Sequence, residues 1–325
     1  MTTHYDAQDL RAIENSNLLR SDANETIFFA RQLEYVKSRT YDIKRPDLSA
    51  FNLFPVDTSA GAGAKTITYR QYDSVGSAKI IASYAEDLPR ADVVAKEFTS
   101  NVRGIGVSYG YDVQEIRYAQ MTGQSLDAKR AASTRKAHEQ KVNQLAWSGD
   151  ADHGLPGFLT NANVPGYTIP ADGTGSSKLF SNKTPDQILR DLNGLANAVY
   201  TQSKGVHRPN QLWIPLAQYT YIASTPRSST SDTTILDHFL MSNRFIKEVV
   251  PVLELASNAN GGVAGATNIM VAVENTEENL QMNITMPFMQ HSPQQKGLAF
   301  EVPCESRFGG VTITYPLAMI KADSI

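Results

Sequence analysis

The glycine-rich run at residues 58–73, TSAGAGAKTITYRQYD, contains the residue types of a phosphate-binding loop. Such a loop needs a glycine directly before its lysine and another glycine five residues earlier, and it leads from a strand into a helix. Here Ala64 precedes Lys65, and Ser59 stands in the place of the earlier glycine. Residues 66–72 are rich in β-branched and aromatic types and roughly alternate, which predicts a strand. The spacing argues against nucleotide binding and favours a loop that leads into a strand.

The histidines and carboxylates offer few candidates for metal binding or catalysis. No two of the six histidines have metal-ligand spacing, and no G-x-S-x-G motif is present. His153 follows Asp150 and Asp152, which is compatible with a small metal site, but we favour a polar turn after a helix. Glu277 and Glu278 form a carboxylate pair that a surface turn explains equally well. We therefore expect no enzyme activity, no metal and no cofactor.

Composition indicates a folded protein whose main function is not the binding of nucleic acid. Of the 325 residues, 41% are hydrophobic and 19% charged, which is enough apolar material for one large domain or two ordinary ones. The formal net charge is −3, whereas nucleic-acid-binding proteins usually carry a basic surplus. The single cysteine, Cys304, excludes an intrachain disulfide. We interpret it as a small buried apolar residue rather than a reactive thiol.

No targeting or membrane segment is predicted. Charged residues interrupt any apolar run near the N-terminus. The longest uncharged stretch, 255–273, contains several asparagines and glycines, so it could not span a bilayer cheaply. We expect synthesis in the cytoplasm and no membrane association.

The N-terminal third has two segments that lack a core of their own. Residues 1–45 are polar, with a helix predicted near 25–37, and must lie on another surface. Strand 66–72, a turn at 73–77 and a returning strand at 78–82 predict a hairpin. A two-stranded hairpin is marginal alone in water, so this one makes sense if another chain supports it.

A strand and a long helix follow. Residues 102–111 alternate and predict a strand, and 113–119 reads as helical. The clearest helix is predicted at 126–147, with Ser125 as N-cap and Gly149 as its end. Its narrow alanine-rich stripe, with Arg135 and His138 in the middle, suits close packing along a sheet.

The remaining chain mixes helices and strands without regular alternation. After the loop-rich residues 150–183, Thr184 caps a helix with Pro185 at its first position. Further helices are predicted at 216–223 and 235–241, and strands at 211–214, 245–255, 267–273, 279–286, 298–303 and 310–321. No internal repeat is present, so the predicted fold class is α+β.

The order of these parts resembles the major capsid proteins of tailed bacteriophages that share the Hong Kong 97 fold. The resemblance is strongest over 66–161, in ITYRQYDSVGSAKII at 67–81 and AWSGDADHGLPGFLTN at 146–161, where the long helix runs into a glycine-rich turn. It implies an N-terminal arm (1–55), an extended hairpin called the E-loop (56–100), a P-domain (101–161 and 286–325) with a "spine" helix at 126–147, and an A-domain (162–285).

The resemblance implies a structural protein that self-assembles through hexamers and pentamers into an icosahedral shell around double-stranded phage DNA. It implies location in the virion and partners such as a portal, decoration proteins and a separate scaffold protein, because only about 55 residues precede the E-loop. Contacts with neighbouring subunits would come from the E-loop residues Lys65, Arg70, Tyr72, Asp73 and Lys79. In some relatives an E-loop lysine joins covalently to a neighbour's asparagine, and Lys65 and Lys79 are the candidates.

Two alternatives stay open at this point. The related encapsulin shells share the fold, so the protein is alternatively the shell of a compartment that holds cargo protein. The other alternative is an enzyme with an unrecognised site near 150–160 or 270–280.

Overall fold

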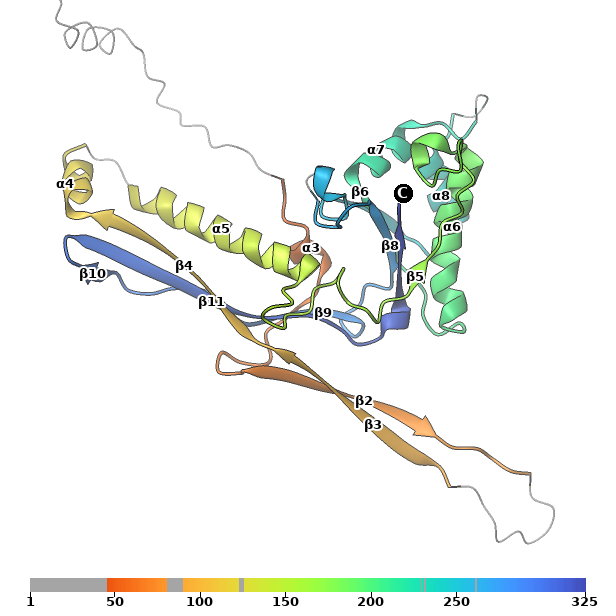
Figure 1. Ribbon diagram of the computed structural model, residues 1–325, viewed down its shortest axis with the longest axis horizontal. Coiled ribbons are helices and arrows are strands. Elements are labelled where there is room, and N and C mark those ends of the chain that lie inside the picture. The colour runs from red at the N-terminus through yellow and green to blue at the C-terminus, as the bar shows by residue number, and fades with distance from the viewer. Residues whose placement is uncertain (1–45, 81–89, 123–125, 229, 231, 261) are drawn as a thin grey trace, which may run out of the picture. The chain divides into compact units, whose positions relative to one another are not determined.

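The computed structural model describes residues 46–80, 90–122, 126–228, 230, 232–260 and 262–325 (Figure 1). The chain divides into two units, Met1–Asp47 and Leu48–Ile325, and the second contains all the elements discussed below. The helix expected near 25–37 lies outside the described residues. Short 3-10 helices lie at Phe180–Asn182, Asn258–Asn260 and Pro316–Ala318.

The first sheet is built around one long strand, β11 (Ala299–Ile313). One edge of β11 pairs antiparallel with β4 along residues 299–308, and the other edge pairs with β10 and then with β9. Strand β1 adds in parallel to β9. The bounds of these partners are β1 Val56–Asp57, β4 Arg103–Asp112, β9 Leu280–Gln290 and β10 Gln294–Lys296.

The long helix α5 (Leu126–Ser148) runs along one face of this sheet, as its alanine-rich stripe predicted (Figure 1). Its buried stripe contains Thr134, His138 and Val142. The expectation for Arg135 was wrong: its side chain is 69% exposed and pairs with Glu139 one turn on, at 2.9 Å. A guanidinium is costly to bury without a partner, so it turns to the solvent side of the helix.

Helix α4 (Val113–Thr122) is joined to α5 by a bidentate ion pair. Arg130 Nη1 and Nη2 donate to the two carboxylate oxygens of Glu115, at 2.8 and 2.9 Å. These bonds lower the pKa of Glu115. The short helix α3 (Ala50–Leu53) packs near the other end of α5, where the backbone N–H of Ala50 donates to the Asn143 side chain.

The second sheet has the strand order β5-β12-β8-β6-β7. Helices α6, α7 and α8 cover one of its faces (Figure 1). Helix α6 begins as predicted at Thr184, which forms a capping box with Gln187. The bounds are β5 Gly166–Tyr167, α6 Pro185–Gln202, β6 Gln211–Pro215, α7 Leu216–Ser224, α8 Ile235–Ser242, β7 Glu248–Val252, β8 Ile269–Val273 and β12 Met319–Asp323.

Two hydrophobic cores lie on opposite faces of the second sheet. Along β8, Val271 faces the core shared with α5, whereas Met270 and Ala272 face the core shared with α6. The first core is centred on four aromatic rings with centroids 4.9–5.8 Å apart, namely Phe54, Trp147, Phe158 and Trp213. The second sheet therefore couples both cores.

The strand pairing departs from the expected segment boundaries. The separately predicted strands at 298–303 and 310–321 are wrong: β11 runs unbroken from 299 to 313, and the chain then changes sheets at Tyr315 and Pro316 to form β12. The expected division at 285/286 falls inside β9, which belongs wholly to the first sheet. The ends of these strands are set by pairing with strands distant in the sequence, so the local alternation of apolar residues does not predict them.

The hairpin consists of β2 (Thr66–Val75) and β3 (Asp92–Asn101), paired antiparallel at ten consecutive positions. The predicted first strand is confirmed, but the predicted return at 78–82 is wrong. Residues 78–80 lie outside any strand, and 81–82 are outside the described residues. Residues 73–75 continue β2 because they pair with Val94, Val93 and Asp92.

Candidate assembly interface

One face of the hairpin is attached to the first sheet near the hairpin root. The Tyr69 ring stacks on Phe98 with a centroid distance of 5.1 Å, and its hydroxyl donates to the carbonyl of Ile313 at 3.3 Å. Burial raises the pKa of this hydroxyl. Ile67 lies so close to Gly309 that a Cβ there would come within 2.7 Å of it. Glycine at position 309 therefore allows the hairpin to approach the sheet.

Hydrogen bonds to backbone carbonyls hold the root of the hairpin. The N–H of Val102 donates to the carbonyl of Lys65 at 2.9 Å, and the Arg307 side chain donates to the carbonyl of Ala62. Arg103 Nε donates to the carbonyl of His153 at 3.1 Å, which links the root to the turn that follows α5. The root is thus held from both strands.

That turn contains the Asp150–His153 pair that sequence analysis considered as a metal site. His153 Nδ1 and Asp150 Oδ2 are 2.8 Å apart, and this bond lowers the pKa of Asp150. Within the described ranges, no group of three or more histidine, cysteine or acidic residues is placed to hold a metal ion. Residues 151–154 form a turn, as the polar-turn interpretation predicted.

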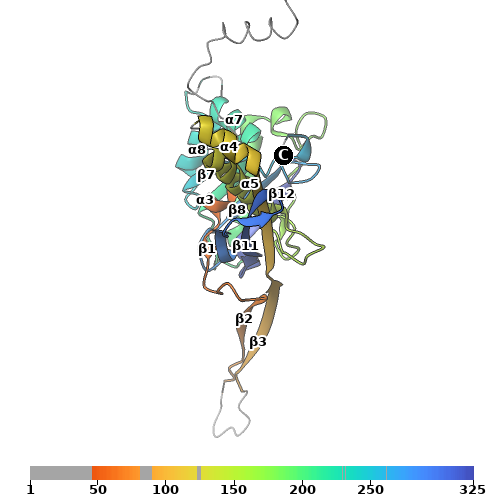
Figure 2. The ribbon, with the colours of Figure 1, turned by 90° about the vertical axis from the view of Figure 1, so that its left-hand side faces the viewer.

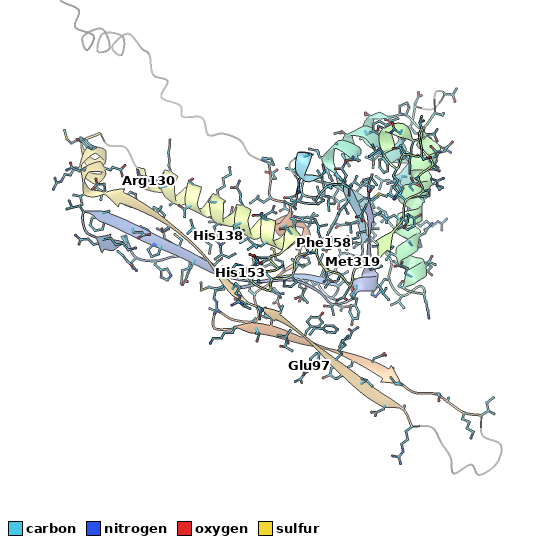
Figure 3. The ribbon with its side chains drawn as sticks, in the orientation of Figure 1. Glu97, Arg130, His138, His153, Phe158 and Met319 are labelled. Carbon is cyan, nitrogen blue, oxygen red and sulfur yellow. The ribbon has the colours of Figure 1, made fainter. Side chains whose placement is uncertain are left out.

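The opposite face of the hairpin carries a ladder of exposed cross-strand pairs. Thr68 and Thr99 are hydrogen-bonded at 2.9 Å, and Arg70 pairs with Glu97 at 2.7 Å. Farther out, Tyr72 lies opposite Ala95. In Figure 3, Glu97 lies on the part of the ribbon that projects beyond the first sheet.

The outer half of the hairpin exposes several apolar side chains among polar ones. Tyr72 and Val93 are 65% and 61% exposed, and Val75 and Val94 are similarly uncovered. We call these four residues the hairpin patch; Tyr72 and Val93 lie on the face of the ladder, and Val75 and Val94 lie on the other face of the ribbon. Figures 1 and 2 show from two directions that this part of the ribbon extends away from the sheets. A two-stranded ribbon with exposed valines and tyrosine on an otherwise folded chain is typical of a surface that another protein covers.

The five contact residues expected from sequence do not form one cluster. Arg70, Tyr72 and Asp73 are exposed along β2, Lys65 lies at the root, and Lys79 lies beyond the end of β2. Sequence reasoning missed the β3 residues Val93, Val94 and Glu97, which lie opposite Ser74, Asp73 and Arg70. The available signal was the β-branched and aromatic content of DVVAKEFTSN at 92–101, because this segment does not alternate regularly.

A second feature that sequence analysis missed is a charged cluster beside α6. The Lys183 ammonium is fully buried with the carboxylate of Asp191, and it also donates to the carbonyl of Pro170 at 2.8 Å. Arg190 bonds both Asp191 and Asp172, at 2.7 and 2.5 Å, and its bond lowers the pKa of Asp172. The cluster ties the loop before α6 to the helix.

Two further expectations concern reactivity and membranes. Cys304 is buried, which raises the pKa of its thiol, so its interpretation as a core residue is confirmed. Within the described part of the chain, no helix is long and apolar enough to cross a membrane.

A projecting hairpin, a long helix laid on a sheet and a second, helix-covered sheet are the parts that the resemblance to capsid proteins implied, and comparison with known proteins identifies the class. The family model described as "Major capsid protein" matches residues 76–325, well over half of the chain. The chain therefore belongs to the major capsid protein family. Among curated proteins, none matches this sequence.

Solved structures show the same fold. The capsid of Myoviridae phage XM1 has a TM-score of 0.76 at 15% identity, covering 91% of this chain and 98% of that one. The capsid of an empty GTA particle has a TM-score of 0.62 at 9% identity, covering 89% and 94%. A virus-like particle from Pyrococcus furiosus has a TM-score of 0.53 at 13% identity, covering 84% and 91%. The fold is the α+β Hong Kong 97 type, as the resemblance implied, and the family implies self-assembly into capsid oligomers of a virion.

Proposed function

We propose that copies of this chain assemble through hexamers and pentamers into an icosahedral shell that encloses double-stranded phage DNA. The hairpin patch carries this proposal, because it exposes apolar side chains on a ribbon whose contacts with the first sheet, among the residues that the structure describes, lie near the root. Repeated contacts between identical copies close into symmetric shells. The net charge of −3 suits a container whose wall does not bind its DNA tightly.

In this proposal the hairpin is the E-loop and lies over a neighbouring subunit. Lys65, Arg70, Tyr72, Asp73 and Lys79 contact that neighbour, together with the valines of the hairpin patch. Each exposed ion pair contributes less than about 1 kcal/mol, so the apolar contacts and their repetition around the shell supply most of the stability.

The remaining parts have proposed roles in the same shell. The first sheet with α5 serves as the P-domain, the second sheet with α6, α7 and α8 as the A-domain, and residues 1–55 as the arm. We propose a separate scaffold protein, a portal and decoration proteins as partners, and synthesis in the host cytoplasm.

Electron microscopy and sedimentation of the purified protein test the assembly. We expect closed shells, or hexamers and pentamers that close on concentration. A protein that stays monomeric or dimeric at every concentration, with crowding agents or host lysate added, would contradict the proposal.

Substitutions in the hairpin patch test the interface itself. We expect Tyr72→Ser combined with Val93→Ser to leave the free energy of unfolding of the free subunit within about 0.5 kcal/mol of the wild type, because both side chains are exposed. Shell formation should fall at least tenfold. Val206→Ser is the matched control, since Val206 is also exposed but lies between α6 and β6. Unchanged assembly of the double variant would remove the patch from the interface.

A compartment for cargo protein is the second candidate function, because the virus-like particle of Pyrococcus furiosus has the same fold. The contents of shells purified from the natural source distinguish the two functions. Packaged DNA supports the phage capsid, and a packaged protein without DNA supports the compartment.

A further inference from the structure

Helix α5 has a basic surplus, although the whole chain has a formal net charge of −3. Five lysine or arginine residues and two acidic residues lie between Leu126 and Ser148, which gives this helix a net charge of +3. After Lys129 the one acidic residue of the helix is Glu139, and it is paired with Arg135 at 2.9 Å. That pair is neutral, so it does not compensate the lysines of the helix.

Three of these lysines lie on the side of α5 that faces away from the first sheet. Lys129, Lys136 and Lys141 are all exposed, and none of them has an ion pair among the described residues. We call these three residues the lysine row. Lys129 and Lys136 are almost two helical turns apart on one line, about 10.5 Å along the axis, and Lys141 follows about 7.5 Å further on at the flank of the exposed side.

The surroundings of the lysine row allow close approach by a large ligand. Ala132, Ser133 and Ala137 are exposed on either side of Lys136, so small side chains separate the long ones. The opposite side of α5 is buried on the first sheet, which fixes the backbone from which the three ammonium groups extend (Figure 1). The row is therefore a set of unpaired cations on a supported helix, and a regular polyanion is the ligand that complements it.

We propose that the lysine row binds the phosphate backbone of double-stranded DNA without sequence preference. The inference rests on the proposed function, in which DNA fills the shell, and it orients the exposed side of α5 towards the interior. A duplex has one phosphate charge per about 1.7 Å of its axis, so phosphates lie within reach of each flexible lysine in any register. Contacts with phosphates position a protein on DNA but do not read its sequence.

Three phosphate contacts give one copy of the chain only weak affinity for DNA. Each neutralised phosphate releases counterions, so the logarithm of the affinity should fall with the logarithm of the salt concentration with a slope of about −2.7. This slope is about a fortyfold loss of affinity between about 50 and 200 mM salt. Weak contacts of this kind, repeated over many copies, line the wall without holding the DNA tightly.

Titration of a fluorescent duplex of random sequence with the unassembled protein tests the proposal. We expect binding at low salt, measured by fluorescence anisotropy, with the slope given above. Lys129→Gln, Lys136→Gln and Lys141→Gln combined should weaken binding at least tenfold and bring the slope close to zero. Glutamine is a good helix former, so this variant should fold. Absence of binding by the wild type at low salt, or equal binding by the triple variant, would overturn the proposal.

A charge-matched control separates the lysine row from net charge. Arg227→Gln, Arg244→Gln and Lys247→Gln combined remove the same charge from exposed positions outside α5 that have no ion pair among the described residues. We expect this variant to bind the duplex within twofold of the wild type. A loss equal to that of the lysine variant would assign the binding to overall charge and contradict the proposal.

The nature of the polyanion and the orientation of α5 are tested separately. Poly-glutamate that binds the lysine row as tightly as DNA would indicate an acidic protein partner and overturn the assignment to DNA. Closed, empty shells should bind duplex added from outside at least tenfold more weakly than the unassembled protein does, and equal affinity would place α5 on the outer side. Shells that form from a protein without DNA affinity contradict this inference alone, whereas DNA binding by a protein that never forms shells contradicts the proposed function.

Discussion

At the scale of single residues, His138 makes the contact between α5 and the first sheet sensitive to pH. Burial lowers its pKa below the ordinary value of 6.5. Arg135 and Glu139 face it from its own helix, and Ser306 and Arg307 from β11. As the pH falls through 6.5, the unfolded chain takes up a proton at this position that the folded chain does not. The stabilising effect is therefore complete above pH 6.5 and is lost progressively below it.

We expect His138→Gln to flatten the pH dependence of unfolding between pH 7 and pH 5. The reduction in slope is at most about 1.4 kcal/mol per pH unit, the value for one proton. Urea unfolding of the unassembled wild type and variant measures it, and the other five histidines cancel because both proteins contain them. Parallel curves for the two proteins would show that His138 does not titrate differently in the folded chain.

At the scale of elements, the open question for the hairpin is whether the Arg70 side chain stabilises its own hairpin or contacts a neighbouring subunit. It pairs with Glu97 at 2.7 Å, and Arg70→Glu would place two carboxylates opposite each other. The exchange Arg70→Glu with Glu97→Arg restores the attraction within the ribbon but interchanges the charges presented to another subunit.

We expect the double exchange to assemble faster than Arg70→Glu alone but more slowly than the wild type. Light scattering during assembly provides the measurement, with the stability of the free subunit as the folding control. A double variant that assembles at the wild-type rate would assign Arg70 to its own hairpin and remove it from the contact residues.

Several elements could be predicted because their signals are local. The α5 stripe, the Thr184 capping box of α6 and the alternation in β2 and β4 each lie within a few turns or residues. The position of the returning strand β3 could not be predicted. The apolar run at 78–82 resembles a strand and lies nearer to β2 in the sequence, whereas 92–101 is selected by its pairing with β2. The expected contact residues consequently include none from β3.

Buried polar groups were harder to predict. Lys183 and Asp191 are eight positions apart and resemble ordinary solvated charges in the sequence, yet they form a buried pair. The hydrogen bond of the buried His138 Nε2 depends on the placement of Ser306, which is 168 positions away in the chain. Such pairings follow from tertiary packing, so sequence patterns alone do not reveal them.

At the scale of the whole molecule, we expect the second sheet to make the unit Leu48–Ile325 unfold cooperatively. Its strands contribute side chains to both cores, so neither core can lose its packing without exposing one face of this sheet. Both tryptophans, Trp147 and Trp213, lie in the first core, whereas Leu192 of α6 is fully buried in the second. Tryptophan fluorescence therefore reports on one core while a substitution perturbs the other.

We expect Leu192→Ala to destabilise the free subunit by about 2–5 kcal/mol, the usual cost of such a cavity. Because the sheet is shared, tryptophan fluorescence and far-ultraviolet circular dichroism should shift to lower urea by the same amount and remain coincident. Met241→Ala, at an exposed position of α8, is the control and should leave both curves unchanged. A fluorescence transition that stays at the wild-type midpoint while circular dichroism shifts would show that the two cores unfold independently, and a capsid subunit of that kind could loosen its second sheet without disturbing α5.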